Sequence, residues 1–165
     1  TFPEGYTVRE AAAQVAETFP SISREAFLKE ALPYEGYLFP DTYFFPSSSD
    51  VASMVALMRS NFNKKIARVT SEVRAPNTLS DTVILASLLE REARTLESKR
   101  VIAGILENRL GLGMPLQVDA VFGYIFGRDT YSPSIADLAV DSLYNTYTHK
   151  GLPPGPIRCV PYSGR

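Results

Sequence analysis

Glu92 is the carboxyl group of this sequence that is best placed for acid–base chemistry. At about 100° per residue, the helical periodicity of the surrounding stretch gathers its apolar side chains on one face, and these are Ile84, Leu85, Leu88, Leu89 and Leu96. Glu92 projects along the middle of that face, whereas Glu90 and Arg91 project elsewhere. A carboxyl group turned toward apolar surroundings resists ionisation, so its pKa rises, as a general acid near neutral pH requires.

The same pattern allows a purely structural role for Glu92. It could pair with a basic residue such as Arg109, or lie at the edge of the apolar face. Glu90 faces away from that face and can form an i,i+4 pair with Arg94, which contributes only a few tenths of a kcal/mol. The spacing selects Glu92 without naming a reaction.

Three further segments combine aromatic rings with amide and carboxylate groups. They lie between Tyr34 and Tyr43, at Gln117–Asp119 and at Tyr144–Tyr147. Sugar rings have apolar faces and hydroxyl edges, so this mixture is typical of a groove for glycans. Aromatic residues between prolines also build ordinary cores, and that alternative stays open. We expect the polar side chains of Gln117, Asp119 and Asn145 to face the groove, with Tyr37 or Tyr147 as a platform.

Metal and thiol chemistry are not indicated. The chain has one histidine, His149, and one cysteine, Cys159, so neither a transition-metal cluster nor an internal disulfide framework is expected. A single histidine of this kind is more often a hydrogen-bonded loop residue than a base. The following loop, Gly151–Ile157, has three prolines and two glycines and should be sharply shaped.

The elements that must position these groups are mostly helices. Apolar periodicity and capping residues predict helices over 8–18, from Ser21 or Ser23 to Pro33, over 51–69, 79–95 and 97–110, and a short one around 134–138. From Met114 onward, the frequent Gly, Pro, Asp and Ser residues predict loops and short strands. We therefore expect a single domain of α+β fold.

Composition limits the possible partners. The 165 residues suffice for one core, 45% of them are hydrophobic, and the formal net charge is −1. Without a basic excess, binding to nucleic acid or to anionic lipid is not expected. No stretch approaches the length of about 18 apolar residues that a spanning helix needs.

Several motifs occur together and in order across nearly the whole chain. They are Thr1–Gly5, Glu35–Tyr43, Leu85–Ala93, Asn108–Leu110, Gly113–Asp119, Tyr144–Tyr147 and Gly151–Ile157. In this combination the chain resembles the YceG-like endolytic murein transglycosylases, the MltG-like family. It departs from the family pattern after Ile157, where Arg158-Cys159-Val160-Pro161-Tyr162 replaces the expected Asn-Pro-Gly turn.

The resemblance implies an organisation and a set of site residues. Residues 1–33 would be the tail of a small LysM-like subdomain, residues 34–157 a catalytic domain truncated at its C-terminal end, and residues 158–165 a divergent tail. Glu92 matches the family's catalytic residue. The expected substrate-binding residues are Glu35, Tyr37, Asp41, Gln117, Asp119, Tyr144, Asn145 and Tyr147.

The resemblance also implies the reaction. Similar proteins are lyases that cleave the β-1,4 bond between N-acetylmuramic acid and N-acetylglucosamine within peptidoglycan strands, leaving 1,6-anhydromuramyl ends, without metal or cofactor. Their partners would be cell-wall synthases at the outer face of the bacterial cytoplasmic membrane, reached through an N-terminal membrane helix outside this chain. Two alternatives remain: a non-catalytic peptidoglycan-binding module, and a hydrolase in which Asp119 or Glu35 assists Glu92.

Overall fold

The computed structural model describes residues 1–67, 78–93, 95–128 and 132–160. The chain divides into two compact units, one formed by Thr1–Leu79 with Arg158–Arg165 and the other by Ser80–Ile157. We call them the discontinuous unit and the inserted unit. The boundary expected after residue 33 falls inside the discontinuous unit, and the relation of residues 1–33 to a LysM-like subdomain stays a prediction.

Helix α1 (Val8–Thr18) opens the discontinuous unit where the sequence predicts it. Thr7 and Glu10 form a reciprocal capping box, in which the Thr7 hydroxyl accepts from the Glu10 N–H and the Glu10 carboxylate accepts from the Thr7 N–H. The apolar stripe of α1 is buried, namely Val8, Ala11, Ala12 and Val15.

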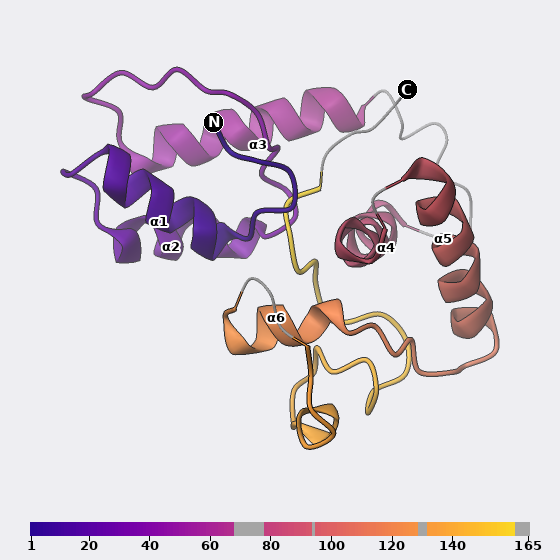
Figure 1. Cartoon of the computed structure of the whole chain (residues 1–165). Coiled ribbons are helices and arrows are strands. Elements are labelled where there is room, and N and C mark those ends of the chain that lie inside the picture. The colour runs from indigo at the N-terminus through magenta and orange to yellow at the C-terminus, as the bar shows by residue number, and fades with distance from the viewer. Residues whose placement is uncertain (68–77, 94, 129–131, 161–165) are drawn as a thin grey trace. The chain divides into compact units, whose positions relative to one another are not determined.

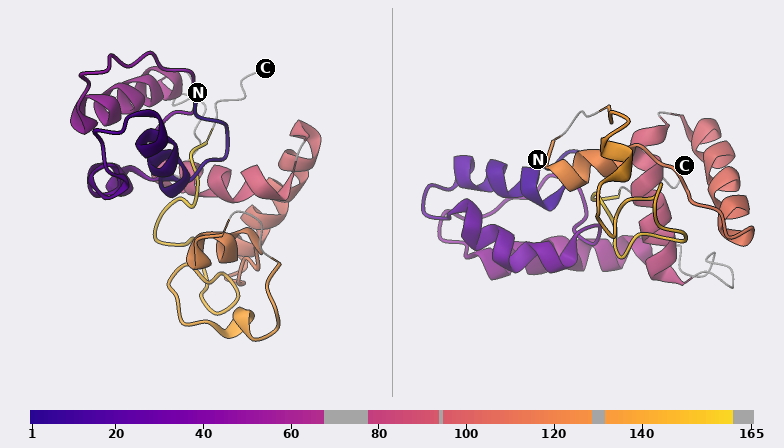
Figure 2. Two further views of the ribbon diagram at one scale, coloured as in Figure 1. Left: turned by 60° about the vertical axis from the view of Figure 1, so that its left-hand side comes forward. Right: turned by 90° about the horizontal axis from the view of Figure 1, so that it is seen from below.

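Helices α2 (Arg24–Ala31) and α3 (Val51–Ile66) complete this unit, with the short 3₁₀ helix η1 (Leu32–Tyr34) after α2. Ser23 caps α2 and Asp50 caps α3 through side-chain oxygens. The three α-helices lie together in each view (Figure 1, Figure 2). The buried core between them includes Phe27, Leu38, Met54 and Met58.

The inserted unit contains helices α4 (Leu79–Glu92), α5 (Leu96–Gly111) and α6 (Ala120–Phe126) and the 3₁₀ helix η3 (Asp137–Ala139). Thr95 caps α5. The core of this unit joins α4, α5 and α6 to the loops around them, through Leu85, Leu88, Leu106, Leu116, Val118, Val121, Phe122 and Ile157. The buried Ser87 hydroxyl on α4 accepts a hydrogen bond from the Ile157 N–H at 3.1 Å.

The structure corrects the expected fold class and one segment. The described residues are helices and loops with a single isolated β-bridge, between Pro115 and Lys150, so the predicted α+β character is not confirmed. Helix α6 lies where loops and short strands were expected. The pair predicted between Glu90 and Arg94 lies outside the described residues, and Glu90 instead accepts from Lys99 Nζ at 2.8 Å.

Within the described ranges, no helix is both long enough and apolar enough to cross a membrane.

Candidate functional site

Glu92 is the last residue of α4, and its side chain is exposed. Leu85 and Leu88, which share its helical face, are buried in the core of the inserted unit. Glu92 is exposed as a whole residue, although protein atoms still remove part of the hydration of its carboxyl group. The Glu92 carboxylate accepts a hydrogen bond from the Ala120 N–H.

The surroundings of Glu92 nevertheless raise its pKa above the usual carboxyl value. The largest cause is loss of hydration where protein atoms displace water from the carboxyl group, and the neighbouring Asp119 carboxylate adds to it. The Ala120 hydrogen bond and Arg91 act in the opposite direction but are outweighed. Glu92 thus keeps its proton to a higher pH than an isolated glutamate does, which suits a general acid.

Asp119 lies directly before α6 and is bound to Tyr147. The Tyr147 hydroxyl donates to Asp119 Oδ1 at 2.5 Å, and the Tyr147 ring packs against Phe122 with ring centroids 5.8 Å apart. Desolvation, the bond to Asp119 and the negative charges of Asp119 and Glu92 together raise the pKa of Tyr147 to about 12. Tyr147 therefore remains a hydrogen-bond donor at neutral pH.

The two polar segments predicted to wall the site are joined to one another. The Gln117 N–H donates to the Thr146 carbonyl oxygen at 3.0 Å, and the Val118 N–H donates to Thr146 Oγ1 at 2.9 Å. These bonds hold residues 117–119 and 145–147 as one piece. Two of the predicted contacts to glycan, Asp119 and Tyr147, lie on these segments and are near enough to Glu92 to interact with it electrostatically.

Gln117 is exposed and has a left-handed backbone conformation, with φ of 54°, which is unusual for a residue other than glycine. Its Oε1 accepts from Arg109 Nη1 at 2.9 Å, and the same guanidinium nitrogen donates to the carbonyl oxygens of Pro115 and Leu116. Arg109 therefore supports the loop that leads to Asp119 and is not among the groups that act on Glu92.

Asn145 occupies a different position from the one predicted. Its side chain is completely buried, its amide nitrogen donates to the carbonyl oxygens of Leu138 and Val140, and its Oδ1 accepts from the Tyr147 N–H. An amide engaged in this way shapes the loop that presents Tyr147 and has no exposed face for a ligand. The direct contact expected of Asn145 is thus replaced by a scaffolding role.

Tyr144 is half-buried and lies against Tyr124, with ring centroids 4.9 Å apart. A methyl group added at Gly155 would come within 3.1 Å of the Tyr144 hydroxyl oxygen, so this glycine allows the loop before Ile157 to approach the ring closely. Tyr144 belongs to the packing beneath the site loops. Its place among the substrate contacts stays a prediction.

The remaining three predicted contacts belong to the discontinuous unit. Glu35 is buried, and both of its carboxylate oxygens accept from the Val8 N–H at 3.1 Å, so it serves the start of α1 instead of an open groove. Tyr37 is half-buried and packs edge-on against Phe62. Asp41 is exposed, and its pKa is lowered mainly by the Thr42 N–H and then by the Asn61 amide.

Two groups at the site were not predicted from the sequence. The Ala120 N–H was not predicted because α6 was not, and the residue type of Thr146 gave no sign that its hydroxyl binds the Val118 N–H. Ala120–Phe126 is short and almost uniformly apolar, so it has no helical period to detect.

The single histidine, His149, is exposed, and its Nδ1 lies 3.0 Å from Thr148 Oγ1, as expected of a loop residue. The described residues contain no cluster of metal-ligating groups.

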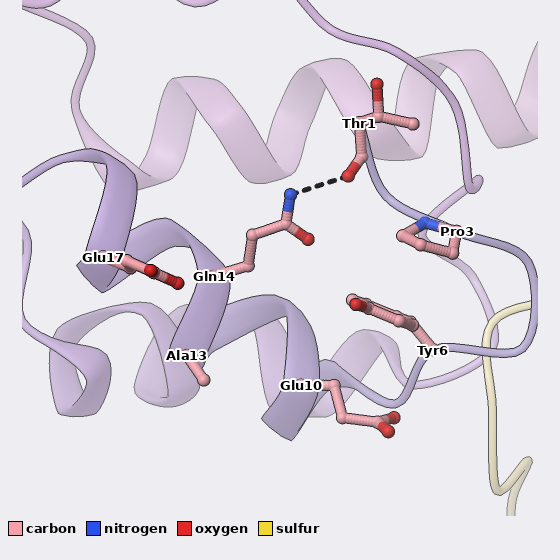
Figure 3. Close-up of a pocket in the computed structure, with 7 residues that line it drawn as sticks. All are labelled: Thr1, Pro3, Tyr6, Glu10, Ala13, Gln14 and Glu17. Carbon is pink, nitrogen blue, oxygen red and sulfur yellow. Dashed lines mark hydrogen bonds between the residues drawn. The ribbon is translucent and has the colours of Figure 1, made fainter.

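The discontinuous unit has an open hollow beside α1 (Figure 3). Thr1, Pro3, Tyr6, Glu10, Ala13, Gln14 and Glu17 line it. Two of these residues are hydrogen-bonded to each other, since the Gln14 amide nitrogen donates to the Thr1 carbonyl oxygen at 2.6 Å (Figure 3). None of the predicted site residues lines this hollow, and it has no part in the chemistry proposed for Glu92.

Comparison with known proteins gives a consistent family. The model of the YceG-like family matches residues 1–163. Two proteins named endolytic murein transglycosylase are similar: one from Streptococcus pneumoniae serotype 2 strain D39 is 32% identical over 95% of this chain, and one from Bacillus subtilis strain 168 is 34% identical over 87% of it.

A crystal structure of a yceG-like protein from Listeria monocytogenes has the same fold, with a TM-score of 0.88 and 29% identity over 96% of this chain and 61% of that one. The chain is shorter than these relatives, since its matches cover 35% of the pneumococcal protein and 41% of the Bacillus protein. The family match spans nearly all of the sequence, and the chain belongs to the YceG-like family.

Proposed function

We propose that this protein is an endolytic peptidoglycan lytic transglycosylase, a lyase in which Glu92 is the single acid–base group. The observation that carries the proposal is the Glu92 carboxyl group itself, which is exposed to solvent and has a raised pKa. The two relatives named endolytic murein transglycosylase support the same activity. The cleaved bond would be the β-1,4 bond between N-acetylmuramic acid and N-acetylglucosamine.

The reaction needs one carboxyl group in two protonation states. Protonated Glu92 first gives its proton to the glycosidic oxygen as the bond to the muramyl anomeric carbon breaks, which releases the N-acetylglucosamine hydroxyl. The resulting Glu92 carboxylate then takes the proton of the muramyl C6 hydroxyl, whose oxygen attacks that anomeric carbon and closes the 1,6-anhydro ring. Glu92 ends protonated, and no water is consumed.

The environment of Glu92 supports both states. Desolvation and the Asp119 charge favour the protonated acid, and the Ala120 N–H supplies a hydrogen bond to the carboxylate formed after the first step. Gln117 and Asp119 would contact the glycan at this end of the inserted unit, and the Tyr147 hydroxyl would hold Asp119 in place. An extracytoplasmic location and cell-wall synthases as partners follow from the same proposal.

A hydrolase is the second candidate, because the Asp119 carboxylate lies close enough to act on the Glu92 pKa. In that mechanism a second carboxylate activates water or attacks the sugar. Glu35 is a poor second carboxylate, since it is buried and bound to the Val8 N–H. Mass spectrometry of the muropeptides separates the two reactions, because the anhydro product is lighter than the hydrolytic product by one water.

The test is the substitution Glu92→Gln, assayed on purified glycan strands. Gln keeps the shape and the hydrogen-bonding ability of the side chain but cannot deliver a proton, so anhydro-ended products should fall by a factor of ~10²–10⁴ or more. Glu90→Gln is the matched control. It changes the same group two residues away, where the side chain bonds to Lys99, and its activity should stay near normal. Full activity of Glu92→Gln would assign the chemistry to another group.

Binding of glycan strands separates the enzyme from a non-catalytic module. Glu92→Gln should still sediment with insoluble peptidoglycan, because only the proton-transferring group is lost. If the unsubstituted protein binds strands but releases neither anhydro-ended nor reducing-end products, the chain is a binding module and the proposed activity is wrong.

A further inference from the structure

Asp119 stands at the start of α6 but does not cap it. An aspartate directly before a helix usually accepts a hydrogen bond from one of the first free N–H groups, and this stabilises the helix by about 0.5–2 kcal/mol. Asp119 makes no such side-chain bond; only its carbonyl oxygen accepts, from the Phe122 N–H at 3.0 Å. Its carboxylate instead accepts the hydroxyl of Tyr147. The Asp119 side chain thus does not cap α6 and binds Tyr147 instead.

Tyr147 is itself held firmly. Its ring packs on Phe122, its N–H donates to the buried Asn145 Oδ1, and the preceding residue, Thr146, bonds to the backbone of Gln117 and Val118. The Tyr147 hydroxyl therefore has little freedom to choose another acceptor. It fixes the Asp119 carboxylate next to the residue whose N–H binds Glu92.

We propose that Asp119 is a positioning residue for Glu92, and that Tyr147 acts on Glu92 only through Asp119. This inference rests on the proposed function and adds the division of roles within its site. The negative charge of Asp119, held in place by the Tyr147 hydroxyl, favours the protonated form of Glu92. The N–H of the adjoining residue, Ala120, then donates a hydrogen bond to the Glu92 carboxylate once the proton has left.

The charged and titratable groups around Glu92 come from four segments. Arg91 lies on its own helix, Asp119 precedes α6, and Tyr147 lies on the loop bound to Asp119. Arg109 on α5 acts on Tyr147 and binds Gln117. Of these, Asp119 is the group that opposes ionisation of Glu92 by its charge, while Arg91 favours it.

The first test measures the titration of the Glu92 carboxyl carbon by NMR in the unsubstituted chain and in Asp119→Asn. Asn keeps the shape of Asp119 and can still accept from Tyr147, so only the charge is removed. The Glu92 titration should move down by about half a pH unit to one pH unit. Asp141→Asn removes an exposed carboxylate of the same unit that is not among the groups acting on Glu92, and it should leave the titration unchanged.

The second test uses the pH dependence of strand cleavage. The alkaline limb of kcat/KM should shift with Asp119→Asn in the same direction as the NMR titration, while Asp141→Asn keeps the original profile. Tyr147→Phe keeps the ring and removes the hydroxyl, and it should lower the rate roughly two- to tenfold. Combined with Asp119→Asn, it should lower the rate no further, because Tyr147 then has no charge left to position.

The outcomes separate the two proposals. If the unsubstituted protein cleaves strands and Asp119→Asn moves neither the NMR titration nor the alkaline limb, the positioning role is wrong and the lytic activity stands. Additive losses for Asp119→Asn and Tyr147→Phe would show that Tyr147 contacts the glycan directly, which also overturns it. If Glu92→Gln retains activity, the proposed function fails, and the NMR titration still tests the influence of Asp119.

Discussion

Ionisation of Glu35 should make the stability of the discontinuous unit fall as the pH rises. The Glu35 carboxyl group is buried, and desolvation raises its pKa from 4.5 to about 7. The Val8 N–H, Arg158 and Arg9 oppose this effect, and the charge of Glu10 adds to it. Burial therefore outweighs every group that stabilises the charged form.

The direction and size follow from proton binding. Between pH 4.5 and about 7, the folded chain binds more protons at Glu35 than the unfolded chain does, so the free energy of unfolding decreases as the pH rises. The stabilisation is fully present below 4.5 and is lost once the pH passes the folded value. A pKa difference of this size lowers the free energy of unfolding by about 3 kcal/mol over the whole window.

The measurement is chemical denaturation at a series of pH values, followed through NMR signals of α1 and α3, which report on this unit alone. In Glu35→Gln the side chain stays neutral and can still accept from the Val8 N–H, so the free energy of unfolding should lose most of its decline between pH 4.5 and 7. Glu30→Gln makes the same change at an exposed position of α2 and should retain the decline.

The opposite slope would refute this account of Glu35. If the unsubstituted chain gains stability across the same window and Glu35→Gln removes that gain, the start of α1 and the Arg158 guanidinium together stabilise the carboxylate by more than burial destabilises it. Glu35 would then be an ionised anchor for α1, as a carboxylate at a helix N-terminus usually is.

Three further outcomes are expected. The rate of strand cleavage should decline on the alkaline side at a higher pH than an ordinary glutamate would give, because the raised pKa of Glu92 keeps the acid protonated to a higher pH. A pH–rate profile that falls in the ordinary carboxyl range would contradict this. Thr7→Ala removes one half of the capping box of α1 and should lower the free energy of unfolding by about 0.5–2 kcal/mol, measured by denaturation. Gly155→Ala should displace the Tyr144 hydroxyl, which lies 3.1 Å from the added carbon, and change the Tyr144 ring signals in NMR spectra while α1 is unaffected.

Sequence patterns predicted the long helices because local signals agreed with tertiary packing. Helices α1 and α3 each begin after a capping side chain, Thr7 and Asp50, and each carries apolar residues at helical spacing. Helix α6 has neither signal, because Asp119 does not cap it and nearly all of its residues are apolar. Its formation depends on burial of Val121 and Phe122, which only the folded chain provides.

The candidate site was predictable in part, for a similar reason. A helical wheel gives the direction of Glu92 but not its distance from the end of the helix, so it could not show that the residue as a whole is exposed while its carboxyl group is partly desolvated. For amides and carboxylates in loops, residue type cannot distinguish a ligand contact from a bond to the backbone. Asn145 and Glu35 both bind backbone groups inside the protein, whereas Asp119 and Tyr147 remain beside Glu92.

The hydrogen bond between Ser87 and Ile157 has a consequence for the order of folding. The discontinuous unit is complete only when Cys159 exchanges backbone hydrogen bonds with Gly5 and Tyr6, across more than 150 positions of chain. Bringing such distant segments together costs entropy that grows with the length of the free chain between them. Once the inserted unit has folded, Ser87 holds Ile157 across 70 positions, and roughly half of that chain no longer counts as free. Closure of the discontinuous unit around Cys159 is thus expected to come late, after the unit that carries Glu92 has already formed.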